Sequence, residues 1–344
     1  MKAMVLFAPK DMRLAEREKP TPGPGEVLVQ VKEVGVCASD VHWYHDGRIG
    51  DNVMAGPLVL GHEFAGIIAE VGPGVTNVKP GDRVAVEPGQ PCFKCEMCAS
   101  EDYNLCPDVK FCGTYPIDGA FREYIAWPAN LVEPVPESVS MGEAAMLEPL
   151  GVGLYAVDIA GDMQGKRIAI LGAGAIGLSM LQCAKAAGCG EAVVIDPIPE
   201  RREVAARLGA DRVFDAGQPG TVQAVKEIFG GLGPDIVFEA AGDNKALCDA
   251  TEMTRPKGLI VWCGIPDNDD ITISASVVRR KGLTIRLVRR SNKVLRRAIG
   301  MVAERKADAA VLVTHRFPLE KTVAAFELAA ARKDGAIRVV IEVS

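Results

Sequence analysis

Four cysteines form the densest group of potential metal ligands in the sequence. Their spacing is Cys-x2-Cys-x2-Cys-x7-Cys, and the residues are Cys92, Cys95, Cys98 and Cys106. Four soft ligands with no open coordination position are typical of a structural zinc site that stabilises a loop. An iron-sulfur cluster and simple buried cysteines are the alternatives. Cys112 is a spare thiol that could replace one of the four ligands.

A second, sparser group consists of Cys37 in GVCASD and the pair His62-Glu63 in GHEFAG. A thiolate, an imidazole and a carboxylate supply three protein ligands and leave a fourth position for water or substrate, as catalytic zinc requires. Spacing alone does not establish this site, because a lone cysteine and a lone His-Glu pair are more often packing and surface residues.

A glycine-rich turn lies in the middle of the chain, after the strand-like run RIAIL and before a helical stretch. It comprises Gly172, Gly174, Ala175, Ile176 and Gly177. The first glycine permits a tight turn, the second lets the backbone approach a pyrophosphate, and the third allows close packing of helix and strand. The helix N-terminus adds N-H groups and the positive end of a dipole, so the turn predicts a dinucleotide site.

The next predicted strand, AVVID, ends at Asp196. A carboxylate at this place accepts hydrogen bonds from the adenosine ribose and repels a 2′-phosphate, which favours NAD over NADP. Arg201 and Arg202 follow closely and could hold such a phosphate or stack on adenine. FAD binding is a weaker alternative, an unliganded turn is another, and Asp196 alone could cap the following helix.

Composition excludes several classes of protein. The chain has 344 residues, more than one hydrophobic core usually spans, so we expect two domains. A net charge of −6 without any Lys/Arg-rich block gives no reason to expect nucleic acid or a membrane surface as a partner. No signal-length apolar region precedes Lys10, and no apolar run reaches the roughly 20 residues that span a bilayer. We therefore expect a cytoplasmic protein whose cysteines remain reduced.

The pattern of predicted elements changes along the chain. Residues up to about 150 contain short β-rich runs such as 27–34, separated by turns, which predict a small irregular β-barrel. From Lys166 onward apolar strands alternate with helices, which predicts a parallel, doubly wound sheet. An amphipathic helical stretch at 319–332 leads to a final strand at 336–341 that could return to the first domain.

Several motifs resemble those of the zinc-dependent medium-chain dehydrogenase/reductase superfamily. The zinc signature GHE-x2-G-x5-G-x2-V is matched by Gly61, His62, Glu63, Gly66, Gly72 and Val75. Within that superfamily, the segments GVCASDVHWYHDGRIG, VLGHEFAG, LEPLGVG and VTHRFPLEK are similar to sorbitol dehydrogenases and related xylitol and arabinitol enzymes. The resemblance implies an α/β protein with a GroES-like irregular β-barrel catalytic domain at 1–152 and 290–344. A Rossmann domain with a doubly wound parallel sheet would occupy 153–289.

The resemblance also implies two zinc ions per chain, one catalytic and one structural. It places the catalytic zinc on Cys37 and His62, with Glu63 as a nearby or direct ligand. Glu148 of LEPL would lie adjacent and reach the metal or its bound water. Simple alcohol dehydrogenases have a cysteine at the position of Glu148, so this glutamate favours a polyol as the substrate.

Proton transfer and substrate contacts follow from the same comparison. Ser39 matches the hydroxyl that takes the substrate proton, and His42 matches the imidazole that passes it outward through the nicotinamide ribose. The residues that fit the substrate pocket are Trp43, Phe111, Thr114 and Arg289. Trp43 and Arg290, the residue after Arg289, depart from the sorbitol dehydrogenase pattern. Arg289-Arg290 replaces an Arg-Tyr pair, and Trp43 replaces a tyrosine, so distal hydroxyl groups should be held differently.

Together these observations predict a zinc-dependent, NAD-linked enzyme that reversibly oxidises a secondary hydroxyl of a sorbitol- or xylitol-like polyol to the ketose. One alternative keeps the fold and changes the substrate to a vicinal diol, an amino alcohol or a simple secondary alcohol. Another is a zinc- and nucleotide-binding protein without turnover. The resemblance further implies a homotetramer or homodimer joined through strands near residues 283–287.

Overall fold

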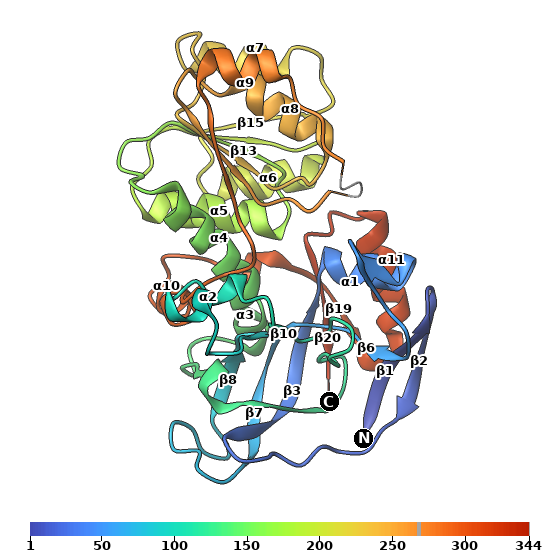
Figure 1. Ribbon diagram of the computed structural model, residues 1–344. Coiled ribbons are helices and arrows are strands. Elements are labelled where there is room, and N and C mark those ends of the chain that lie inside the picture. Colours follow the sequence, from blue (N-terminus) through green and yellow to red (C-terminus); the bar gives the residue numbers. More distant parts are fainter. Residues whose placement is uncertain (267–269, 344) are drawn as a thin grey trace. The chain divides into compact units, whose positions relative to one another are not determined.

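The computed structural model describes residues 1–266 and 270–343. Residues 267–269, in the expected Rossmann domain, and Ser344, in the expected catalytic domain, lie outside the described residues. The chain divides into two compact units. One comprises Met1–Glu148 and Leu295–Ser344, and the other comprises Pro149–Val294. These divisions lie a few residues from the boundaries that the sequence suggested. Figure 1 shows the course of the chain through both units.

A seven-stranded sheet forms the centre of the first unit. Its strand order is β12-β8-β7-β3-β20-β19, with β11 also paired to β3, and a separate sheet has the order β2-β1-β6. The strands are β1 (Lys2–Ala8), β2 (Asp11–Glu16), β3 (Glu26–Val36), β4 (Arg48–Ile49), β5 (Asn52–Val53), β6 (Leu58–Val59), β7 (Glu63–Val71), β8 (Arg83–Val86), β9 (Gly89–Gln90), β10 (Lys110–Phe111), β11 (Tyr124–Pro128), β12 (Val132–Pro134), β19 (Val313–Pro318) and β20 (Arg338–Glu342). The pairing of β20 with β3 returns the end of the chain to this unit.

Short helices connect and cover these strands. They are α1 (Ala38–Asp46), α2 (Glu96–Ala99), α3 (Met141–Ala145), α10 (Leu295–Ala303) and α11 (Thr322–Ala331), with 3-10 turns η1 (Tyr103–Leu105), η2 (Ala129–Leu131), η3 (Ala310–Leu312) and η4 (Leu319–Lys321). A core of apolar side chains includes the fully buried aromatic residues Trp43, Phe64, Phe121 and Phe326. Phe121 and Phe326 meet edge to face with ring centroids 5.5 Å apart, so α11 packs on the β-rich core.

The second unit is a six-stranded parallel sheet of order β15-β14-β13-β16-β17-β18. Its elements are β13 (Ile168–Leu171), α5 (Ala175–Ala186), β14 (Ala192–Ile195), α6 (Pro199–Arg207), β15 (Arg212–Phe214), α7 (Thr221–Ile228), β16 (Ile236–Glu239), α8 (Asn244–Met253), β17 (Leu259–Trp262), α9 (Ala275–Lys281) and β18 (Thr284–Leu287), preceded by α4 (Leu147–Ala160). All residues of β13, β14 and β16 are buried, as expected for central strands that helices cover on both faces. The expected combination of an irregular β-rich domain and a doubly wound sheet is confirmed.

Strand order creates a specific place in this second sheet. The chain leaves β13 toward β14 and β15 on one side, and later enters β16, β17 and β18 on the other. The carboxyl ends of β13 and β16 therefore flank a topological switch point, where open α/β sheets bind their ligands.

Candidate active site and metal centres

Two paired strands bring the sparse Cys37 and His62-Glu63 group together. Cys37 directly follows β3, and His62 directly precedes β7. These strands run antiparallel with Gly35 opposite Glu63, so the end of one lies beside the start of the other. Ligand atoms of Cys37, His62 and Glu63 all lie within 4.8 Å of one another. A thiolate, an imidazole and a carboxylate at this separation fit a single zinc ion.

Asp40, on the first turn of α1, orders both ligand segments. One carboxylate oxygen accepts a hydrogen bond from the backbone N-H of Cys37 at 3.0 Å, and the other accepts one from that of Gly61 at 3.1 Å. The second oxygen also lies 3.4 Å from Nδ1 of His62. Because Nδ1 faces this carboxylate, Nε2 is the nitrogen available to a metal.

The charges around His62 act strongly on its imidazole. Burial alone lowers the pKa of His62, but the Asp40 carboxylate and the Cys37 sulfur raise that pKa well above its ordinary value. A proton would therefore compete with a metal ion for the ring, and metal binding there would release that proton.

Arg338 lies beside Glu63 in the protein interior. Its Nη2 atom is 2.9 Å from Oε1 of Glu63, and its Nη1 atom donates to the carbonyl of Val36 at 3.0 Å. Gly35 leaves space for this carboxylate, since a Cβ there would come within 2.3 Å of Oε2 of Glu63. The guanidinium offsets part of the negative charge that a thiolate and carboxylate bring to the site.

Glu148, near the start of α4, is partly buried and is not among the three residues whose ligand atoms cluster within 4.8 Å. Its carboxyl nevertheless interacts electrostatically with His62, Glu63 and Arg338. Desolvation raises the pKa of Glu148, the His62 and Arg338 charges lower it, and the Glu63 carboxylate raises it further. Glu148 thus lies near the candidate metal site, as expected of an adjacent group.

Helix α1 carries the two residues expected to move the substrate proton. Ser39 and His42 are three positions apart, so they share one face of the helix. Nδ1 of His42 lies 3.8 Å from Oδ2 of Asp46. The neighbouring Trp43 is buried in the core with 1% of its surface exposed, and its indole nitrogen has no hydrogen-bond partner among the described residues.

The other expected substrate residues lie in different parts of the chain. The Phe111 ring, on β10, is 5.2 Å from the His62 ring between centroids. Thr114 follows at a short turn and is half-buried. Arg289 is exposed and belongs to the second unit, after β18.

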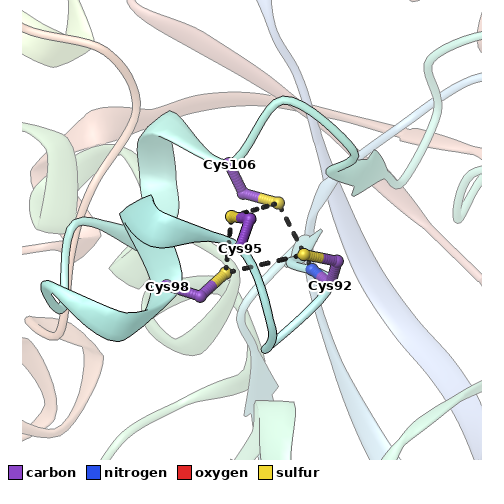
Figure 2. A group of neighbouring side chains, drawn as sticks. All are labelled: Cys92, Cys95, Cys98 and Cys106. Carbon is purple, nitrogen blue, oxygen red and sulfur yellow. Dashed lines mark hydrogen bonds between the residues drawn. The ribbon is translucent and has the colours of Figure 1, made fainter.

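The four-cysteine group forms a compact lobe around α2 (Figure 2). The Sγ atoms of Cys95 and Cys98 are 3.4 Å apart, those of Cys95 and Cys106 are 3.8 Å apart, and those of Cys92 and Cys98 are 3.9 Å apart. Such separations are typical of four thiolates around one tetrahedral ion rather than of disulfides. Cys112 is buried outside this group.

The glycine turn has the geometry that a dinucleotide needs. Gly172 has a φ of 95°, which favours glycine, and Gly174 is the N-cap of α5. A Cβ on Gly177 would come within 1.8 Å of the Gly172 carbonyl oxygen, so the helix packs closely on the turn. Ala175 and Ile176 start the helix, whose first N-H groups face the switch point.

Asp196 lies at the end of β14, buried with 3% of its surface exposed. Oδ2 accepts a hydrogen bond from the backbone N-H of Ala173 at 2.7 Å, and Oδ1 accepts one from Ile198 at 2.8 Å. The carboxylate is thus fixed next to the glycine turn. Arg202 donates to the Asp196 carbonyl at 2.6 Å and lies 3.7 Å from the Asp215 carboxylate. Arg201 is half-buried, and its Nη1 would lie 3.8 Å from a Cβ on Gly174.

Sequence reasoning missed Asp40 and Arg338. Each had a detectable signal. Asp40 lies three residues after Cys37, at the start of a helix, where a carboxylate accepts from the capping backbone N-H. Arg338 is a cation within a strand whose other residues, Glu342 excepted, are apolar and buried, and such a charge usually has a buried partner.

Comparison with known proteins agrees with this geometry. Residues 23–137 match the alcohol dehydrogenase GroES-like domain, and residues 175–304 match the zinc-binding dehydrogenase domain. The chain is 37% identical to sorbitol dehydrogenase from Bacillus subtilis over 341 residues, which cover 99% of this chain and 97% of the relative. It is 40% identical to sorbitol dehydrogenase from Gallus gallus over 328 residues, which cover 94% of this chain and 92% of the relative.

Two solved structures are also similar. An oxidoreductase/dehydrogenase of unknown specificity from Escherichia coli superposes with a TM-score of 0.95 at 34% identity, covering 100% of this chain and 99% of the other. A structure from Sinorhizobium meliloti, described as a zinc-binding dehydrogenase and bound to NADP, has a TM-score of 0.92 at 28% identity, covering 99% and 98%. The resemblance read from the motifs is confirmed: the chain belongs to the zinc-dependent medium-chain dehydrogenases of the alcohol and polyol dehydrogenase type.

Proposed function

We propose that this protein is a zinc-dependent polyol dehydrogenase that uses NAD to oxidise a secondary hydroxyl to a ketone, reversibly. The observation that carries the proposal is the convergence of Cys37, His62 and Glu63 within 4.8 Å, in a chain whose relatives include sorbitol dehydrogenases. A zinc- and nucleotide-binding protein without turnover is disfavoured, because the chain also has Ser39, His42 and Glu148, the residues expected to take part in catalysis.

Cys37 and His62 would hold the catalytic zinc, with Glu63 and Glu148 as the carboxylates that bind it directly or through water. A zinc ion there supplies a Lewis acid that lowers the pKa of the substrate hydroxyl. Asp40 orients His62, and Arg338 holds Glu63 in place. These electrostatic interactions are strong because the site is buried and little water screens them.

Ser39 would take the proton from the substrate hydroxyl, and His42 would pass it outward to solvent. Their spacing on α1 supports this order, because both side chains lie on the same face of one helix. NAD supplies the acceptor for the hydride that leaves the carbinol carbon. Phe111 would pack against the substrate beside His62, and Thr114 and Arg289 remain proposed substrate contacts. Trp43 is also expected there from the sequence, but it lies in the core with 1% of its surface exposed, so it would act on the pocket only through the residues that cover it.

NAD is the cofactor that we propose in preference to NADP. The Asp196 carboxylate is held by two backbone N-H groups next to the glycine turn, where it would accept hydrogen bonds from the ribose hydroxyls and repel a 2′-phosphate. Arg202 donates to the Asp196 carbonyl and lies 3.7 Å from the Asp215 carboxylate, so its guanidinium is already held by protein groups. A similar structure binds NADP, so both cofactors belong in the test.

The four-cysteine lobe would hold a second, structural zinc ion. None of the ten cysteines is disulfide-bonded in the part of the chain that the structure describes, which agrees with the reducing cytoplasm that we propose as the compartment. Among the described residues, no helix combines the length and apolar character needed to cross a membrane.

We also propose that the protein forms a homodimer or homotetramer through β18. This strand is the edge of the parallel sheet, and Leu287 at its end is 67% exposed. An edge strand presents unpaired backbone groups that a second copy can pair with. Leu287→Lys should shift the protein toward the monomer in light scattering, whereas an unchanged mass would contradict this interface.

The substrate is tested by measuring reduced-cofactor formation with a panel of pentitols, hexitols, vicinal diols, amino alcohols and simple secondary alcohols, with NAD and with NADP. We expect the highest kcat/KM with NAD and a pentitol or hexitol. Turnover confined to short alcohols or diols would instead favour the alternative substrates. No turnover across the panel would favour the non-catalytic zinc- and nucleotide-binding protein.

A further inference from the structure

Glu239 is a buried carboxylate to which the proposed mechanism gives no role. It is the last residue of β16 and has 0% of its surface exposed. In the parallel sheet it lies opposite Leu171 of β13 on one side and Trp262 of β17 on the other. Glu239 is therefore at the topological switch point, between the ends of the strands that form the dinucleotide crevice.

One oxygen of this carboxylate holds the loop after β16. Oε1 accepts hydrogen bonds from the backbone N-H groups of Ala241 and Gly242, both at 2.8 Å. Oε2 is buried and has no hydrogen-bond partner among the residues that the structure describes. A buried acidic residue of this kind costs stability unless its interactions offset the desolvation, and burial indeed raises the pKa of Glu239 while the N-H groups of Gly242 and Ala241 lower it.

The glycine turn packs against the loop that Glu239 holds. A Cβ on Gly172 would come within 2.9 Å of the Ala240 carbonyl carbon and of the Ala241 nitrogen. Ala240 also donates to the Leu171 carbonyl at 2.8 Å. A displacement of the Ala240–Ala241 peptide would therefore move the first glycine of the turn with it.

The other oxygen reaches the loop after β17. A Cβ on Gly264 would come within 2.6 Å of Oε2 of Glu239 and within 2.3 Å of the Gly242 nitrogen. The backbone N-H of Gly264 donates to the Glu239 carbonyl at 3.1 Å. The loops that follow β16 and β17 are thus packed against each other around the Glu239 side chain.

We propose that Glu239 is a positioning residue for the dinucleotide: it fixes the loops after β16 and β17 and, through the Ala240–Ala241 peptide, the glycine turn at Gly172. It acts through these loops and not by contact with the cofactor. The proposal rests on the dinucleotide binding described under Proposed function. The Glu239 side chain should therefore affect binding of the pyrophosphate more than binding of the adenosine, whose ribose Asp196 would bind.

The test is binding of NADH, followed by nicotinamide fluorescence, and binding of adenosine, which lacks the pyrophosphate, followed by calorimetry. In Glu239→Ala, two buried N-H groups lose their acceptor, so the Kd for NADH should rise at least about tenfold while the Kd for adenosine changes less than about twofold. Glu239→Gln retains an oxygen that can accept both hydrogen bonds, so it should restore most of the NADH affinity.

Glu143→Ala is the matched control, because Glu143 is also a buried carboxylate that accepts a hydrogen bond from a backbone N-H, in the other compact unit. It should lower thermal stability and leave both Kd values unchanged. If Glu239→Ala does not fold, Gly264→Ala tests the same packing by inserting a Cβ between Gly242 and Glu239, and it should also weaken NADH binding selectively.

Wild-type affinity for NADH in Glu239→Ala would overturn the proposal, and so would an equal loss of adenosine and NADH affinity, since that indicates general loosening of the unit. A wild-type protein that binds neither NADH nor NADPH would contradict the proposed function itself, and this inference with it.

Discussion

Asp40 and His62 are neighbours in the buried part of the candidate active site, with Oδ1 of Asp40 3.4 Å from Nδ1 of His62. The same carboxylate accepts hydrogen bonds from the backbone of Cys37 and Gly61. One side chain therefore orients a candidate ligand and fixes the two chain segments that carry Cys37 and His62. Carboxylates behind metal-binding histidines commonly contribute almost as much to a site as the ligands themselves.

Replacement of this carboxylate should weaken the metal site. In Asp40→Asn, zinc affinity measured by competition with a chelator should fall about 10- to 100-fold, because the amide no longer sets the His62 ring and its basicity. Asp51→Asn changes an exposed aspartate in the turn between β4 and β5 and should leave zinc affinity unchanged. Equal affinity in both variants would mean that Asp40 does not support a metal ligand.

The four-cysteine lobe should bind zinc independently of the catalytic site. Cys98→Ser should lower the zinc content from two ions per chain to one and decrease the melting temperature, since the loop loses its cross-link. Cys189→Ser, at a free thiol in the other unit, should retain both ions. A Cys98→Ser protein with full zinc content would contradict a structural site at this lobe.

Proton transfer through His42 should depend on pH. In His42→Ala, turnover should fall about 10-fold or more near neutral pH and less at alkaline pH, where hydroxide can replace the imidazole. His45→Ala provides the control, because His45 lies on the same helix but packs beside Tyr44 with ring centroids 5.1 Å apart. Equal slowing of His42→Ala at both pH values would argue against a relay.

An ion-pair cluster at the start of β13 and β16 should make stability depend on pH. Asp235 accepts hydrogen bonds from the Arg167 side chain and backbone and from Arg255 at 2.6 to 3.0 Å. The Arg167 guanidinium, assisted by Arg255, holds the pKa of Asp235 well below its usual value. A lowered folded-state pKa stabilises the protein above the unfolded-state pKa, and this contribution is lost as pH falls toward the folded-state value.

Asp235→Asn should therefore reduce the free energy of unfolding by about 1 to 3 kcal/mol at neutral pH, measured by urea denaturation. The difference from wild type should be constant between about pH 5 and 7 and should shrink below about pH 4. A difference that increases as pH falls would contradict the assignment of a lowered pKa.

Local patterns allowed much of the fold and part of the site to be predicted. The four cysteines and the glycine turn lie within short segments, so their spacing alone nearly determines their geometry. Asp196 could be predicted because one strand and one helix connect it to that turn. These features depend on local backbone structure and not on distant parts of the chain.

Other residues could not be placed because their roles depend on distant pairing. Asp40 meets His62 because of the register of β3 with β7, and Arg338 reaches Glu63 because β20 pairs with β3. Glu239 acquires its neighbours from a strand order in which β16 lies between β13 and β17. Such contacts join segments far apart in the sequence, so a local pattern can mark Asp40 or Arg338 as unusual but cannot identify its partner.

Dependence of catalysis on zinc is tested by turnover of the preferred polyol with NAD before zinc removal, after removal by a chelator and after zinc is returned, with metal content measured in parallel. We expect activity to fall together with the zinc that Cys37 and His62 hold, and to recover when zinc returns. Polyol oxidation that continues at its full rate after this zinc has been removed would contradict a zinc-dependent mechanism.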